Sequence, residues 1–164
     1  MVSICYVTHS SLKAGEWPLA RELREICPDT KFICGEVSFR QKRKLDILVK
    51  SYPKLLLFGF TSAIKMFRGG SKPDVIFVET DITAIQFGAI KYFLKKRHCK
   101  LILTNFILVR RDRGIFTTLQ LIIHHLTLIA CDKVILAAES DVELCKSHFP
   151  NHSDKFIFVT FVIG

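Results

Sequence analysis

The sequence predicts an α/β fold in which a mostly parallel, doubly wound sheet of six or seven strands forms one Rossmann-like domain. The first observation is that short apolar runs alternate along the chain with longer segments of helical periodicity. The second is a continuous apolar run at residues 75–78, which is typical of a strand covered on both faces. The third is the length of 164 residues, which suits one domain with a single core.

The first third of the chain begins with the order strand, helix, strand, as a mononucleotide-binding fold does. An apolar strand is expected at residues 1–8, and Pro18 suits the first turn of a helix that ends before Pro28. A second strand is expected at residues 31–37. Residues 45–50 alternate enough to form a short strand, although a helical turn there stays open.

The middle third continues the alternation of helices and strands. A helix is expected between Pro53 and the glycines at 69–70, before the apolar strand at residues 75–78. Asp81 follows that strand, and we expect it to cap a helix whose last turn is rich in lysine and arginine. The strand expected at residues 100–105 then continues the sheet.

The last third contains a helix of unusual composition and a final strand, helix, strand unit. The helix expected at residues 115–130 is apolar on nearly all sides, so it is either buried or at an interface. After a strand at residues 134–138, Ser140 and Glu143 have the spacing of a capping box, in which each side chain bonds the other's backbone. A strand at residues 155–163 completes the unit.

Charge and cysteine content narrow the expected partners and compartment. The chain has 24 Lys and Arg against 15 Asp and Glu, a net charge of +9. Such a charge attracts an anionic partner, and basic segments beside Phe39, Phe67 and Phe106 favour an anionic membrane surface. Because no basic and aromatic interleaving of the RNA-recognition type is present, no nucleic acid partner is expected. The six cysteines lie mostly in apolar runs, as reduced thiols of a cytoplasmic protein do.

Ligands of an open parallel sheet gather beyond the carboxyl ends of the strands, so the candidate site residues lie in the loops that follow strands. His9 directly follows the first strand and is the candidate general base for deprotonating a hydroxyl, with a structural or solvated role as the alternative. The other candidates, which would bind the molecule that carries this hydroxyl, are Gly15, Glu16, Glu79, Asp81, Asn105 and Glu139.

Two kinds of site are not expected from the sequence. The loop after the first strand has one glycine where a dinucleotide fingerprint needs three, so no nicotinamide cofactor is expected. His124 and His125 are adjacent and point about 100° apart on a helix, so they cannot bind one metal ion together. We expect them to be packed polar groups, and we expect neither a metal nor another cofactor.

A family resemblance appears in residues 130–164. The resemblance is carried by the segment Asp132-Lys133-Val134-Ile135, the acidic turn at residues 139–141 and the strand from Asp154-Lys155 to Gly164. Together they resemble the last βαβ unit in the N-terminal domain of GT-B glycosyltransferases of the type called family 4. The resemblance is close over this segment and otherwise rests on the order of elements. The chain departs from the family at residues 103–106, which hold no histidine where members usually carry one.

The resemblance implies the acceptor-binding half of an enzyme that moves a sugar from a nucleotide-sugar donor to a hydroxyl. It implies that Gly15 lies in a loop that faces the cleft, and some GT-B families place a catalytic histidine at the point where His9 lies. In that family the donor binds mainly to a C-terminal half, for which no residues of this chain correspond. We therefore expect the chain to be inactive alone and to need that half, or a partner subunit, in the cytoplasm with peripheral contact to a membrane.

Two other functions stay open at this point. One is a non-catalytic α/β binding or scaffold module derived from such a domain. The other is a small Rossmann-like nucleotide binder that acts alone.

Overall fold

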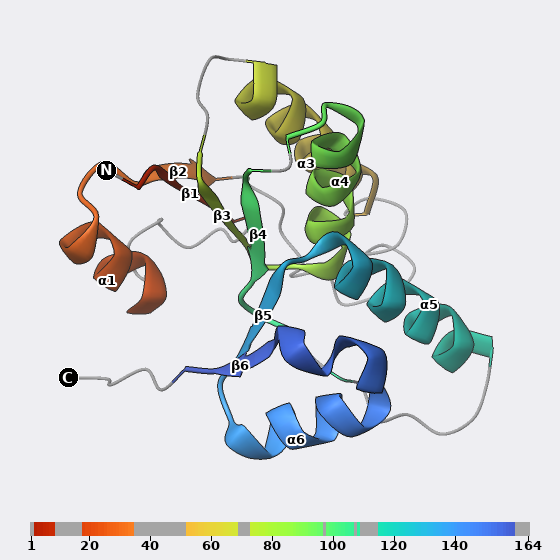
Figure 1. The fold of residues 1–164 in the computed structure, drawn as a ribbon. Coiled ribbons are helices and arrows are strands. Elements are labelled where there is room, and N and C mark those ends of the chain that lie inside the picture. Colours follow the sequence, from red (N-terminus) through yellow and green to blue (C-terminus); the bar gives the residue numbers. More distant parts are fainter. Residues whose placement is uncertain are drawn as a thin grey trace, which may run out of the picture.

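A computed structural model of the chain describes residues 2–8, 18–34, 52–68, 73–96, 98–106, 108 and 115–159. The described strands form one sheet of six parallel strands in the order β2-β1-β3-β4-β5-β6 (Figure 1). The strands are β1 (Ile4–Thr8), β2 (Lys31–Cys34), β3 (Val75–Val78), β4 (Lys100–Leu103), β5 (Lys133–Leu136) and β6 (Phe156–Phe158). The predicted α/β class and the parallel sheet are confirmed; the strand expected at residues 45–50 lies outside the described residues.

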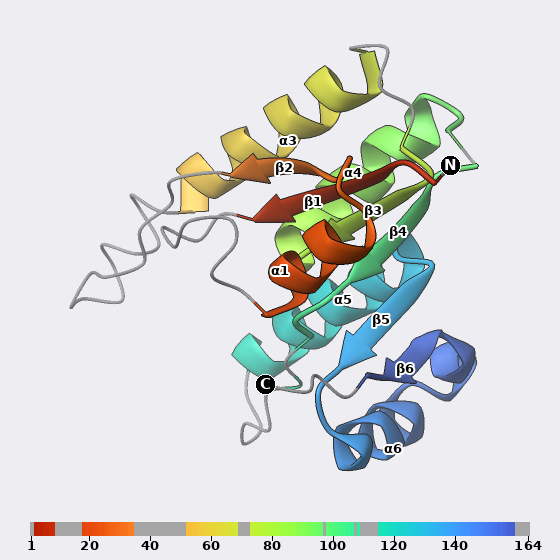
Figure 2. The ribbon, with the colours of Figure 1, turned by 90° about the vertical axis from the view of Figure 1, so that its left-hand side faces the viewer.

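The described helices alternate with the strands along the chain. They are α1 (Pro18–Ile26), α3 (Tyr52–Arg68), α4 (Asp81–Phe93), α5 (Ile115–Ala130), α6 (Glu139–His148) and the 3-10 helix η2 (Pro150–Lys155). Helix α1 covers one face of the sheet, and α3, α4 and α5 form a layer on the other (Figures 1 and 2). The chain runs from β1 to β2 in one direction and from β3 to β6 in the other, so right-handed crossovers place their helices on opposite faces.

The main core lies between the sheet and the layer of α3, α4 and α5. Alternate strand residues such as Val7, Ile76 and Leu101 are fully buried and pack in one cluster with side chains of these helices. The intervening positions Phe77 and Ile102 are only half-buried. Tyr6, on the same face as these two, is only 2% exposed, so the burial of this face varies along the sheet.

Two predicted helix starts are wrong. Thr80, not Asp81, is the N-cap of α4, because Thr80 is still extended and its hydroxyl accepts a hydrogen bond from the Thr83 backbone at 3.4 Å. Helix α6 begins at Glu139 after Ala138, and no side chain caps it. Only residues 137 and 138 separate the strand from the helix, so Ser140 lies inside the first turn instead of at the cap position.

The last strand is shorter than the sequence predicts. Residues 150–155 form η2, so β6 begins only at Phe156 and is described to Phe158. The prediction had extended this strand from 155 to 163, of which residues 160–163 lie outside the described residues.

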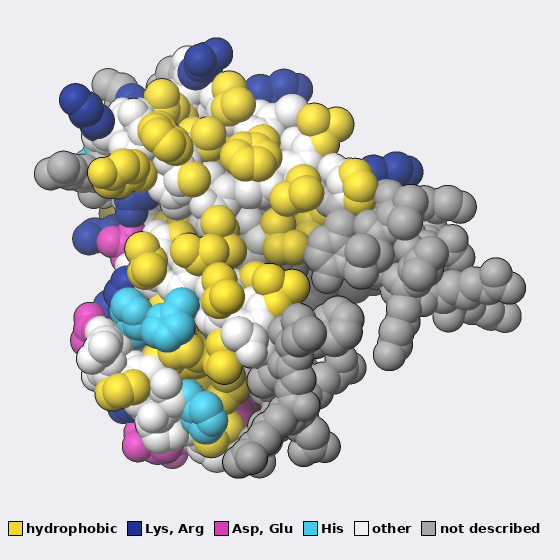
Figure 3. Space-filling model, turned by 90° about the vertical axis from the view of Figure 1, so that its right-hand side faces the viewer, with side chains coloured by type: hydrophobic (Ala, Val, Ile, Leu, Met, Phe, Trp, Pro, Cys, Tyr) yellow, Lys and Arg dark blue, Asp and Glu magenta, His cyan; other side chains and the backbone are white. Residues whose placement is uncertain are grey.

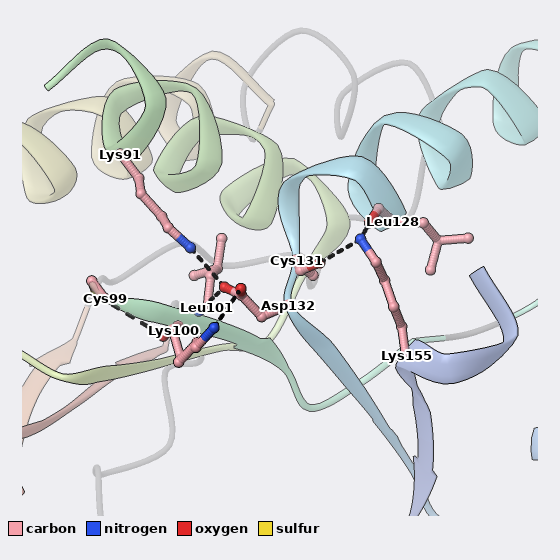
Figure 4. Close-up of polar contacts among 8 residues, drawn as sticks. All are labelled: Lys91, Cys99, Lys100, Leu101, Leu128, Cys131, Asp132 and Lys155. Carbon is pink, nitrogen blue, oxygen red and sulfur yellow. Dashed lines mark hydrogen bonds and ion pairs between the residues drawn. The ribbon is translucent and has the colours of Figure 1, made fainter. Parts of the chain in front are cut away.

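A polar network joins α4, β4 and β5 at the amino edge of the sheet (Figure 4). The Asp132 carboxylate accepts hydrogen bonds from Lys91 Nζ at 2.6 Å and from the Leu101 backbone N–H at 2.9 Å. Lys100 Nζ lies 3.4 Å from the other carboxylate oxygen. Burial acts to raise the pKa of Asp132, but the hydrogen bonds and the lysine charges prevail and hold it below its usual value.

Lys155 fixes the end of α5 from the neighbouring η2. Its ammonium donates to the backbone carbonyls of Leu128 at 2.5 Å and Cys131 at 2.9 Å, which lie at the C-terminal end of α5, where carbonyls lack partners within the helix (Figure 4). Nearby, α4 and α5 cross closely, because a Cβ on Gly88 would lie only 2.5 Å from the Ala130 Cβ.

The cysteines are free thiols, and Cys5, Cys99, Cys131 and Cys145 are buried. Burial raises the pKa of Cys5 and Cys131 to about 12, so these thiols stay protonated at neutral pH. None of the described helices combines the length and apolar character that a membrane-crossing segment requires.

Candidate functional site

The carboxyl edge of the sheet has its switch point between β1 and β3. These two strands are neighbours, yet the connection that leaves β1 runs to β2 on one side and the connection that leaves β3 runs to β4 on the other. Connections that diverge in this way open a crevice at the carboxyl ends of the two strands, which is where α/β sheets bind ligands. Thr8 ends β1 and Glu79 directly follows β3, so both residues lie at this point.

A buried carboxylate with two hydroxyl donors occupies the switch point. The Tyr6 hydroxyl donates to Glu79 Oε1 at 2.8 Å, and the Thr8 hydroxyl donates to Glu79 Oε2 at 2.6 Å. Glu79 is only 6% exposed, and both donors are more deeply buried. The bond from Thr8 is short, and the two bonds together hold the carboxylate in one orientation.

The strand register brings these three residues together. Tyr6 pairs with Phe77 in the parallel ladder, so Thr8, two residues on, is level with Glu79 on the same face of the sheet. The Tyr6 ring packs against Phe77 and against Phe32 of β2. Burial raises the pKa of Tyr6 far above its usual value, and the Glu79 charge raises it further. At neutral pH the Tyr6 hydroxyl therefore stays protonated and donates to the carboxylate.

A second polar pair lies between the start of α4 and the middle of α5. His124 Nδ1 is 3.5 Å from Asp81 Oδ2, and the imidazole is almost fully buried. Within the described part of the chain, neither ring nitrogen of His124 has a hydrogen-bond partner. The ring packs against Phe106, with 4.8 Å between centroids, and against Phe149. Since these aromatic rings separate the imidazole from solvent, the pair positions α4 against α5 instead of presenting a base to a ligand.

The remaining predicted residues are only partly gathered at the switch point. Asn105 is exposed two residues beyond β4, the strand next to β3 at the same edge. Glu139 is exposed at the start of α6, and its strand β5 lies two positions from β3, about 10 Å away. His9, Gly15 and Glu16 lie outside the described residues.

Tyr6 and Thr8 are members of the site that were not predicted. Their signal was available, because they are alternate polar residues in an otherwise apolar first strand, which places them on one face. The burial of His124 agrees with the prediction of a packed polar group, but its Asp81 partner was not predicted. Nothing in the spacing of residues 81 and 124 indicates that the two helices bring them together.

Neither a metal-binding cluster among the described residues nor a comparison with known proteins indicates what this site binds. In the ranges that the structure describes, no three His, Cys, Asp or Glu side chains gather closely enough to hold a metal ion. Comparison with protein families finds no family model that matches this chain, and comparison with curated protein sequences finds no match either.

Proposed function

We propose that this chain is the acceptor-binding half of a glycosyltransferase that moves a sugar from a nucleotide-sugar donor to a hydroxyl acceptor. The observation that carries the proposal is the Glu79 carboxylate, held by Tyr6 and Thr8 at the switch point of a parallel sheet. A carboxylate accepts hydrogen bonds from the hydroxyls of a sugar or another alcohol. Its two donors hold it in place before a ligand arrives, which limits the cost of ordering on binding.

The neighbouring residues suit the same role. His9 follows Thr8 in the chain and stays the proposed base for the acceptor hydroxyl. Asn105 adds an exposed amide at the end of the neighbouring strand, and the acidic Glu139 lies farther along the same edge. These groups offer both donors and acceptors, as recognition of a hydroxyl-rich molecule requires.

One sheet supplies only one wall of a cleft for sugar transfer. The reaction needs the leaving diphosphate stabilised and the anomeric carbon held in line with the acceptor oxygen. A general base contributes roughly 10²–10⁴-fold and does not replace a donor site. The proposal therefore includes a donor-binding half, as a further domain or a partner subunit, and places the complex in the cytoplasm. Its contact with a membrane is argued in the next subsection.

The test is sugar transfer by the chain alone and together with its donor-binding half. That half is sought as a polypeptide that copurifies from the native host and binds a nucleotide sugar. Transfer to hydroxyl acceptors from labelled nucleotide sugars is then measured with wild type, Glu79→Gln and the control Glu143→Gln, whose side chain is exposed on α6. We expect no transfer by the chain alone, transfer by the complex, and a drop of roughly 10-fold to 100-fold for Glu79→Gln.

Two results would overturn the proposal. Transfer by the isolated chain would show that no second half is needed, and full activity of the Glu79→Gln complex would remove the role of the switch point. A copurifying partner without nucleotide-sugar binding, in a complex that transfers no sugar, would instead favour the scaffold module.

A further inference from the structure

The outer side of α5 is apolar and open to solvent. The sixteen residues of this helix include no Asp, Glu, Lys or Arg. Leu119, Ile122, Leu126 and Ile129 recur at helical spacing and are all exposed, while Leu128 faces the core. The sequence allowed two explanations for such a helix, burial or a position at an interface. Because these side chains are exposed, burial does not explain them and the interface explanation remains.

Helix α4 continues this surface at its C-terminal end. Tyr92 is 78% exposed and Phe93 is 76% exposed. We call the exposed side chains of Tyr92, Phe93, Leu119, Ile122, Leu126 and Ile129 the apolar helix face. Figure 3 shows hydrophobic side chains spread over this side of the molecule, and they continue onto α3, where Leu57 is exposed. Contiguous exposed apolar surface of this kind marks a site of association.

A groove of about 860 Å³ runs between α4 and α5 at the same end. Tyr92 and Ile129 contribute to its apolar walls, and three lysines, Lys91, Lys95 and Lys155, also line it. Two aspartates, Asp132 and Asp154, line it as well, so the groove has apolar walls with three cations and two anions along them.

The cations outnumber the anions at this end of the molecule. Asp132 lies between Lys91 and Lys100, so one carboxylate serves two ammonium groups (Figure 4). Lys95 and Lys96 follow α4 directly, and Lys95 is exposed. The whole chain has a net charge of +9, which adds a long-range attraction to anionic surfaces.

The charge decides which occupant suits the apolar helix face. A second copy of the chain would bring the same net charge of +9 to the contact, and like charges oppose association. An anionic bilayer complements the lysines and accepts the apolar side chains among its acyl chains. Tyrosine and phenylalanine beside lysine are the side chains that suit the boundary between headgroups and hydrocarbon.

The aromatic side chains that are available to contact lipid differ from those that the sequence suggested. Phe67 and Phe106 are buried in the core, so neither can contact lipid, and Phe39 lies outside the described residues. The side chains that the structure exposes beside lysines are Tyr92 and Phe93.

We propose that the apolar helix face docks this protein on the surface of a bilayer that contains acidic phospholipid. Tyr92, Phe93 and Ile129 enter the headgroup region, and Lys95, Lys96 and Lys100 lie against the lipid phosphates. The contact is peripheral and independent of sugar transfer, so it extends beyond the proposed function.

The experiment is flotation of the purified full chain with vesicles. One set contains phosphatidylcholine alone, and the other also contains phosphatidylglycerol. We expect recovery only with the acidic vesicles and a fall at high salt, because salt screens the lysines. Phe93→Asp and Lys95→Glu should each reduce partitioning by about tenfold or more, through lost apolar contact and reversed charge.

Matched controls lie on α1, on the opposite face of the sheet (Figure 2). Ile26→Asp removes an apolar side chain that is 75% exposed, and Arg21→Glu reverses an exposed charge. Both controls should float as the wild type does, and circular dichroism and thermal melting should show that all four variants fold.

Three results would overturn the proposal. They are equal recovery with neutral vesicles, absence of binding to either kind of vesicle, and control variants that lose binding as much as Phe93→Asp does. Sedimentation equilibrium tests the second copy: a dimer that Phe93→Asp dissociates, with no flotation, would assign the face to self-association instead.

Discussion

Replacing Tyr6 by phenylalanine should destabilise the protein through the buried carboxylate at the switch point. The substitution removes one hydroxyl from a residue that is 2% exposed and leaves the ring that packs against Phe32 and Phe77. It also removes the 2.8 Å hydrogen bond to Glu79, so a buried charged oxygen loses a donor.

The expected loss follows from the charge and burial of the acceptor. A hydrogen bond to a charged group contributes about 1.5–3 kcal/mol, so Tyr6→Phe should lower the free energy of unfolding by about 2 kcal/mol. With Glu79→Gln already present, the acceptor is neutral and the same substitution should cost about 1 kcal/mol. The double-mutant cycle should therefore give a coupling of about 1 kcal/mol between the two residues.

The pH dependence has a defined sign. Because burial and the Glu79 charge raise the pKa of Tyr6 in the folded state, ionisation above pH about 10 favours the unfolded state. The stability that the Tyr6 hydroxyl adds is complete below that pH and is lost as the pH rises toward the folded pKa. The difference in unfolding free energy between wild type and Tyr6→Phe should therefore shrink above pH 10.

Urea unfolding followed by circular dichroism measures these free energies. Tyr92→Phe is the matched control, because it makes the same chemical change on an exposed tyrosine and should alter stability by less than about 0.5 kcal/mol. A coupling below about 0.3 kcal/mol, which is within ordinary additivity, would refute the carboxylate cluster as a cooperative unit.

Three further predictions concern the rest of the described structure. Asp132→Asn should lower the free energy of unfolding, measured in urea, by about 1–2 kcal/mol at neutral pH, because it breaks the pair with Lys91. The pKa of Asp132 is lowered only in the folded state, so the difference from wild type should be lost as the pH falls below about 4. Lys155→Met should lower stability by about 1–2 kcal/mol through two lost hydrogen bonds to the end of α5, and an unchanged thermal midpoint would contradict that role. Iodoacetamide should label the exposed Cys34 under native conditions and leave Cys131 unmodified, because the Cys131 thiol is buried and its pKa is raised to about 12. Mass spectrometry measures the labelling, and rapid labelling of Cys131 would contradict its burial.

The sequence was a good guide to the elements and a weaker one to their ends. The apolar runs predicted the strands that the structure contains at Ile4–Thr8 and Val75–Val78, because burial on a sheet requires continuous or alternating apolar residues. Helix starts were less certain, since several polar residues near a boundary compete for the cap. At α4, Thr80 takes the position predicted for Asp81 because the extended conformation ends one residue earlier than the pattern suggested.

The candidate site was predicted only in part, because local patterns indicate where strands end but not which residues meet there. Glu79 could be identified because it follows an apolar strand, and all carboxyl ends of a parallel sheet meet at one edge. That Tyr6 and Thr8 donate to it depends on which strands are neighbours and in what register, and these residues are more than 70 positions away in the chain. The contact between Asp81 and His124 depends in the same way on how α4 packs against α5.

The sequence by itself determined the alternation of strands and helices, the parallel sheet and the excess of positive charge, because these follow from local periodicity and composition. The tertiary structure decided the strand order, and with it the position of the switch point between β1 and β3. It also decided which side of α5 faces solvent, since a helix that is apolar nearly all round has no polar side to mark its exposed face. Long-range pairing and packing set both outcomes, and no local pattern encodes them.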